Sequence, residues 1–126
     1  MSNALFIGNL PGTYDIGHYR RDTFIRSFTL CQDDAAETPI DLTGCSFTMQ
    51  VRKVRSNDIV VTVGTSSGEI TLVPLLGQVR IQFTSEQNTA LPDGCPMVWD
   101  LQMTNAQNIV KTMLRGKFEV ENDVTA

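Results

Sequence analysis

The strongest evidence for the fold lies in PMVWDLQMTNAQNIVKTMLRGKFEVE, residues Pro96 to Glu121. Near its start the apolar side chains occupy every second position, at Met97, Trp99, Leu101 and Met103. Toward its end the same alternation places on one face Val110, Thr112, Leu114, Gly116, Phe118 and Val120. A period of two is typical of a strand with one buried face. Because only the short turn Thr-Asn-Ala-Gln joins the two runs, we predict that they pair.

Gly116 interrupts the second of these strands. A glycine within a strand indicates a bulge or a position that another group approaches closely. We predict that Gly116 lies opposite Trp99, because a missing side chain there would let the large indole fill the core without a clash.

The same alternation recurs along most of the chain. It places Phe24, Phe28 and Leu30 on one face, and similar inward sets follow at Cys45, Phe47, Met49 and Val51 and at Val79, Ile81 and Phe83. Turn-forming residues such as Thr43-Gly44 and Ser66-Ser67-Gly68 separate the runs. This pattern is typical of a sandwich or barrel. We predict an all-β, antiparallel, Ig-like β-sandwich of seven to eight strands.

Two segments depart from the strand pattern. In TSEQNTALP, Ser85 is a candidate cap for one short helical turn that ends before Pro92 and crosses between sheets. Residues 1–18 contain four glycine or proline positions and little periodicity. We therefore predict an irregular N-terminal arm over residues 1–18, which orders against a neighbouring chain, and a sandwich domain over residues 19–126.

Composition narrows the possible functions. The 126 residues are 41% hydrophobic and 19% charged, which fits one globular domain. A net charge of −4 argues against a general nucleic-acid-binding protein. No apolar run reaches the roughly 20 residues of a membrane helix, and the start lacks the features of a signal peptide. We expect no membrane partner and folding in the cytoplasm.

The cysteine and histidine residues, which could act in catalysis or bind a metal, form no catalytic or metal-binding pattern. The three cysteines, Cys31, Cys45 and Cys95, match no zinc motif, and we expect free, buried thiols, with a Cys31–Cys45 bond left open. The only histidine, His18, is expected to lie in a solvated loop. The sequence predicts no enzyme, no cofactor, no metal and no small-molecule substrate.

Two charged clusters are more consistent with solvated surface than with a ligand site. Asp33, Asp34 and Glu37 lack the spacing and glycine of a calcium loop. The basic groups HYRRD, residues 18–22, and VRKVR, residues 51–55, are expected to be edge residues or salt-bridge partners at a subunit contact.

The order of several motifs resembles a known group of proteins. YRRDTFIRSFTL (residues 19–30), TPIDLTGCSFTMQVRK (38–53), GEITL (68–72), GQVRIQFTSEQNTALPDGCPMVWDLQMT (77–104) and MLRGKFEVENDVT (113–125) follow one another. This series resembles phage and prophage tail-associated β-sandwich proteins, such as the N-terminal domain of baseplate upper proteins and tail-fibre adaptors. Arg21 stands where that pattern has glycine, and Cys95-Pro96-Met97 replaces its aromatic residue before Trp99.

The resemblance implies a virion structural protein without catalytic residues, assembled in the host cytoplasm. Its expected partners are other virion proteins and copies of itself, held by an arm that adds a strand to a neighbouring sheet. The candidate partner-binding residues are Leu5, Phe6, Ile7, Leu10, Tyr14 and Tyr19. Two alternatives remain open, which are a capsid decoration or cement protein and an Ig-like cell-surface or carbohydrate-binding module.

Overall fold

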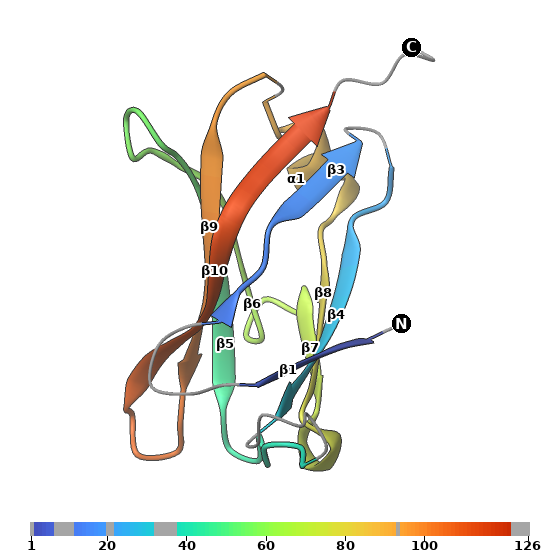
Figure 1. Cartoon of the computed structure of the whole chain (residues 1–126), viewed down its shortest axis with the longest axis vertical. Coiled ribbons are helices and arrows are strands. Elements are labelled where there is room, and N and C mark those ends of the chain that lie inside the picture. The colour runs from blue at the N-terminus through green and yellow to red at the C-terminus, as the bar shows by residue number, and fades with distance from the viewer. Residues whose placement is uncertain (1, 7–11, 20–21, 32–37, 93, 122–126) are drawn as a thin grey trace.

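The computed structural model describes residues 2–6 (backbone only), 12–19, 22–31, 38–92 and 94–121. Within these residues ten strands form two sheets that pack face to face (Figure 1). The prediction of an all-β, Ig-like sandwich is confirmed. The strand count exceeds the predicted seven to eight, because three of the strands lie in the N-terminal region.

The first sheet contains four strands in the order β1-β4-β8-β7. Their bounds are β1 Ser2–Phe6, β4 Ile25–Cys31, β8 Gln78–Gln82 and β7 Ile70–Val73. β4, β8 and β7 pair antiparallel, whereas β1 runs parallel to β4. β1 and β7 are therefore the edge strands of this sheet.

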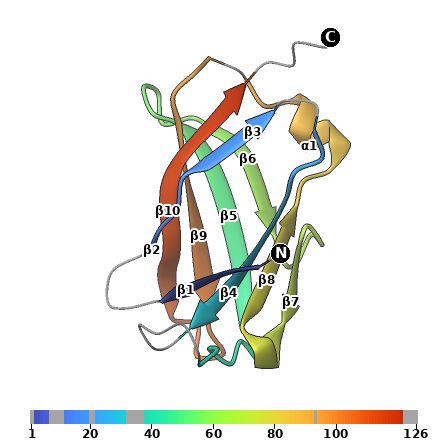
Figure 2. The ribbon, with the colours of Figure 1, turned by 45° about the vertical axis from the view of Figure 1, so that its right-hand side comes forward.

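The second sheet contains six strands in the order β2-β10-β9-β5-β6, with β3 also paired to β10 (Figure 2). Their bounds are β2 Gly12–Thr13, β3 Ile16–Tyr19, β10 Val110–Glu121, β9 Met97–Thr104, β5 Ser46–Lys53 and β6 Ile59–Gly64. β10, β9, β5 and β6 pair antiparallel, but β2 and β3 run parallel to β10.

The N-terminal region is more regular than the sequence predicted. Its described segments are strands that pair within the chain, with Ala4 opposite Thr29 and Ile16 opposite Phe118. The reason is that β10, at 12 residues, is long enough to offer its free edge to both β2 and β3. The predicted boundary at residue 18 falls inside β3. Whether this region also contacts a neighbouring chain remains a prediction.

The core lies between the two sheets and follows the predicted alternation. Phe28, Leu30, Val79 and Ile81 enter it from the first sheet and Phe47, Met49, Val51, Trp99 and Leu101 from the second, all nearly or fully buried. Phe24 and Phe83 stack with ring centroids 4.2 Å apart, and Phe118 packs 5.7 Å from Phe24. Contacts of this kind add to the stabilisation from burial.

β10 differs from the prediction in its first few residues. A bulge between Thr112 and Leu114 places Met113 and Leu114 both in the core. Val110 and Thr112 consequently do not share a face with Leu114, and Val110 is exposed. A bulge shifts the alternation by one residue, which a strict period of two cannot anticipate.

The predicted helical turn is present as α1, Ser85–Thr89, and it connects β8 of the first sheet to β9 of the second. Its N-cap is Thr84 rather than Ser85. The Thr84 hydroxyl accepts the Gln87 N–H at 3.1 Å, and the Gln87 side chain accepts the Thr84 N–H at 2.9 Å. This reciprocal arrangement satisfies two N–H groups that lack a partner inside the helix.

Candidate functional site: the outer face of the second sheet

The segment between β2 and β3 fixes the edge of the second sheet against β10. Tyr14 donates its N–H to the Arg115 carbonyl at 2.9 Å, and the Asp15 carboxylate accepts the Lys117 N–H at 2.9 Å. The Tyr14 ring turns inward and meets Phe28 edge-on, with centroids 5.2 Å apart. Tyr14 and Asp15 therefore connect β2 to β3, and both residues remain hydrogen-bonded to β10.

Gly116 lies opposite Trp99, as the sequence predicted. The space for its missing side chain is taken by the backbone of Tyr14, whose carbonyl carbon lies 2.6 Å from the position of an ideal Cβ. The Tyr14 carbonyl also accepts the indole N–H of Trp99 at 2.7 Å. The glycine thus admits the crossing chain, which in turn satisfies the buried indole, so the predicted pairing holds but its main reason is the close approach of Tyr14.

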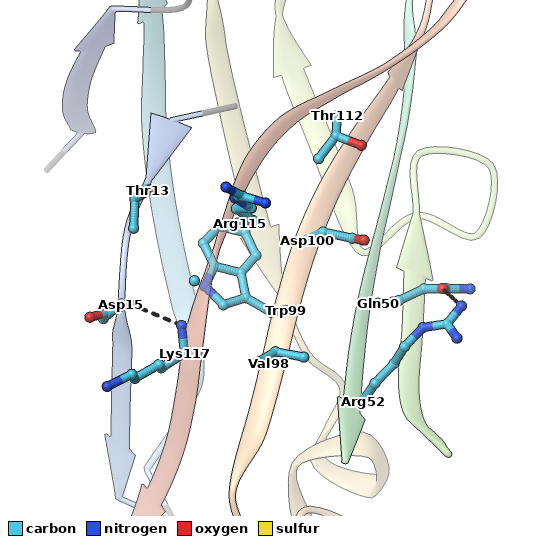
Figure 3. Close-up of a pocket in the computed structure, with 11 residues that line it drawn as sticks. Thr13, Asp15, Gln50, Arg52, Val98, Trp99, Asp100, Thr112, Arg115 and Lys117 are labelled. Atoms are coloured by element: carbon cyan, nitrogen blue, oxygen red, sulfur yellow. Dashed lines mark hydrogen bonds between the residues drawn. The ribbon is translucent and has the colours of Figure 1, made fainter. Parts of the chain in front are cut away.

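A hollow of about 700 Å³ lies on the outer face of the second sheet, over β2, β10, β9 and β5 (Figure 3). Three cationic side chains line it: Arg52, Arg115 and Lys117. Asp15 and Asp100 supply carboxylates, and the remaining lining is Thr13, Gln50, Val98, Trp99, Thr112 and Gly116. The hollow therefore carries more positive than negative groups, on a chain that is acidic overall.

Asp100 lies in the middle of this hollow, on β9, and its side chain points toward Gln50 (Figure 3). Burial raises the pKa of Asp100, and the positive charge of Arg52 partly opposes that rise. Arg52 is oriented by a hydrogen bond from its guanidinium to the Gln50 side-chain oxygen at 2.6 Å. β5 is an inner strand, so Arg52 and Lys53 do not mark an exposed edge as predicted.

Further along β10 the same outer face becomes acidic. Glu119 and Glu121 are exposed, and they pair with Gly17 and Tyr19 of β3. Tyr19 is half exposed, so an aromatic ring borders the two carboxylates. The sequence could have predicted this row of charges. Every second residue of the strand from Arg115 onward is charged, namely Arg115, Lys117, Glu119 and Glu121, and these positions alternate with those on the core side.

His18 is buried, contrary to the prediction of a solvated loop residue. It lies on β3, its Nε2–H donates to the Asn88 side-chain oxygen at 2.7 Å, and its ring meets Phe24 edge-on. Asn88 in turn donates to the Asp22 carbonyl at 2.5 Å. Burial lowers the pKa of His18, and the hydrogen bond to Asn88 partly counteracts this. The His18 ring therefore ties β3 to α1 and packs against Phe24, just before β4, which is a structural role.

The cysteines are free thiols, as expected, and Cys31 and Cys45 are not bonded to each other. Cys31 is buried, whereas Cys45 and Cys95 are only half-buried, so the expectation of burial holds for the first alone. Among the described residues no group of three His, Cys, Asp or Glu side chains is placed to hold a metal ion. The acidic cluster at Asp33, Asp34 and Glu37 falls outside the described residues.

The six predicted partner-binding residues do not form one surface. Leu5 and Phe6 belong to β1, where their backbones pair with Leu30 and Cys31. Ile7 and Leu10 lie outside the described residues. The Tyr14 ring already contacts its own core, and of the set Tyr19 is the one described side chain that is exposed.

No described helix is long and apolar enough to span a membrane.

Comparisons with known proteins show a fold likeness alone. No protein-family model matches the chain, and no curated protein sequence matches it. Among solved structures, the N-terminal domain of phage TP901-1 ORF48 matches with a TM-score of 0.55 at 10% identity, covering 96% of this chain and 99% of that one.

Two animal proteins match more loosely. Drosophila OTK, extracellular domains 3-5, gives a TM-score of 0.31 at 14% identity, covering 98% of this chain and 37% of that one. The V domain of amphioxus IgVJ-C2 gives 0.27 at 9% identity, covering 83% and 98%. These two scores are too low to support an argument, whereas the phage domain shares the fold over nearly its whole length.

Proposed function

We propose that this chain is a non-enzymatic structural protein of a phage particle, placed in the tail, baseplate or fibre-attachment region. It acts through contacts with other virion proteins and with copies of itself. The observation that carries the proposal is the fold likeness to a phage domain, which extends over 96% of this chain and 99% of that one. The ordered series of motifs from Tyr19 to Thr125 supports the same assignment.

The described residues also favour contact over catalysis. The single histidine is committed to Asn88 and Phe24, and the Asp15 carboxylate is committed to the backbone of β10. The hollow of about 700 Å³ opens on a sheet face and is lined by charged side chains from β5, β9 and β10 and by Asp15 between β2 and β3. Such a face is suited to docking another protein, where rims of charge set register and orientation.

The test is to purify particles of the phage or prophage that encodes the chain and separate tails from heads. Mass spectrometry of each fraction is expected to find the chain in the tail fraction, in several copies for each particle. Presence in the head fraction alone would contradict the proposed location and favour a capsid decoration protein. A chain that is expressed but absent from both fractions would contradict the virion assignment altogether.

A further inference from the structure

β10 carries its charges in two blocks. On its outer face two cationic residues, Arg115 and Lys117, are followed by two anionic residues, Glu119 and Glu121. All four side chains are exposed, and among the described residues none of them forms a salt bridge. Lys117 and Glu119 are the one adjacent pair of opposite charge in this row, and Arg115 lies opposite Asp100 of β9, yet no salt bridge joins either pair. Among the described residues both blocks therefore remain available to a partner.

This order of charges is complementary to itself when it is reversed. If two copies meet through β10 in opposite directions, about a two-fold axis near Phe118, then Arg115 faces Glu121 of the partner subunit. Lys117 then faces Glu119 of the partner subunit, and the symmetry repeats both pairs. A self-complementary patch is what a two-fold dimer requires. We propose that the outer face of the second sheet binds a second copy of this chain in that antiparallel arrangement.

The surroundings of β10 fit this occupant. The basic block lines the hollow of about 700 Å³, which provides room for carboxylates that protrude from a second copy. Two of the described carboxylates already lie beside the basic block, but neither forms a salt bridge with it. Asp15 accepts the Lys117 N–H, and Asp100 lies opposite Arg115 in the strand register, while burial raises the pKa of Asp100 and the charge of Arg52 partly opposes that rise. Val98 is 40% exposed and Tyr19 51% exposed, so apolar surface lies beside the charged row and gains from being covered.

The face is large enough for a specific dimer. Four neighbouring strands at about 4.8 Å and eight residues, the length of β9 and of β5, at about 3.4 Å give a face of roughly 19 by 27 Å, or about 500 Å² for each copy. Both copies together would bury about 1,000 Å², which matches the ~1,000 Å² expected of a biological interface. An interface of this size and polarity favours a reversible dimer that further virion contacts reinforce.

This inference rests on the proposed structural role, because it names a surface for one of its self-contacts. The experiment uses the purified chain alone, so its failure leaves the location in the particle untouched. Sedimentation equilibrium over a concentration series up to about 1 mM would measure the dissociation constant. Circular dichroism and thermal unfolding would confirm that each variant folds.

Two charge-reversal variants provide the decisive comparison. The first, Arg115→Glu with Lys117→Glu, makes the row entirely acidic. The second, Glu119→Lys with Glu121→Lys, makes it entirely basic. Matched controls carry the same number of reversals at exposed sites elsewhere, as Arg55→Glu with Arg80→Glu and as Asp58→Lys with Glu86→Lys.

The wild-type chain is expected to dimerise, and each β10 variant alone is expected to dimerise at least tenfold more weakly, because every cross-interface attraction becomes a repulsion. An equimolar mixture of the two variants is expected to form a heterodimer, since an acidic row then faces a basic one. The matched controls are expected to keep wild-type dimerisation. A wild-type chain that stays monomeric, or a dimer that both β10 variants retain, would overturn the proposal.

Discussion

Replacement of Gly116 by alanine tests the contact between the N-terminal segment and β10. An ideal Cβ at this position would lie 2.6 Å from the Tyr14 carbonyl carbon and 3.0 Å from the Asp15 side-chain oxygen. Real Cβ atoms do not approach backbone so closely, so the Tyr14–Asp15 segment must move. That movement weakens two hydrogen bonds at once, from the Trp99 indole to Tyr14 and from the Lys117 N–H to Asp15.

The expected loss is large for a single methyl group. Overpacking of this kind costs about 1–3 kcal/mol, and each weakened hydrogen bond adds about 1 kcal/mol. We therefore expect the free energy of unfolding to fall by roughly 3–5 kcal/mol, a substantial fraction of the 5–15 kcal/mol typical of a domain. Urea unfolding followed by fluorescence measures it directly, because Trp99 is the only tryptophan and reports on the contact itself.

Gly17→Ala is the matched control. Gly17 lies on the neighbouring strand β3, and a Cβ there would meet nothing within 4 Å. We expect its unfolding free energy to stay within about 0.5 kcal/mol of wild type. If Gly116→Ala were as stable as Gly17→Ala and kept the same Trp99 emission, the proposed role of Tyr14 at this crossing would be refuted.

Three further predictions concern named contacts. Trp99→Phe leaves the Tyr14 carbonyl without its indole donor, and we expect a loss of about 1–3 kcal/mol in urea unfolding, whereas an unchanged midpoint would contradict it. Thr84→Ala removes the helix cap and is expected to cost about 1 kcal/mol, whereas Ser85→Ala should be nearly neutral, and the reverse order would restore the predicted cap at Ser85. Burial lowers the pKa of His18 below 6.5 in the folded state. As pH falls, the imidazole therefore takes up a proton at a higher pH in the unfolded state than in the folded state. Stability should therefore decrease below about pH 6.5, and His18→Gln should flatten that region of the pH profile.

The sequence predicted the layers of this fold better than its edges. Strands that alternate regularly, such as the one through Phe47, Met49 and Val51, were assigned to the correct face because burial of one face imposes that pattern. The opposition of Gly116 and Trp99 was also predicted, since a short turn fixes the register of a hairpin. The bulge at Met113 was missed because Met113 and Leu114 are both apolar, so either residue fits a position that faces the core.

The N-terminal strands could not be predicted with the same reasoning. Gly12–Thr13 is too short to show a period, and parallel pairing with β10 joins residues about a hundred positions apart. The Ile16–Tyr19 segment does alternate, with Ile16 and His18 buried, but a histidine does not count as apolar in a periodicity argument. The proposed docking face was missed for a related reason, because the sequence alone does not show that its charged residues lie together on one side of a sheet.

Electron cryomicroscopy of the intact particle is the measurement that tests the assigned role most directly. We expect density that fits this two-layer sandwich at repeated positions in the tail, with the outer face of one copy against that of another. Tail density that is fully explained by other chains, with no position left for this fold, would contradict the account.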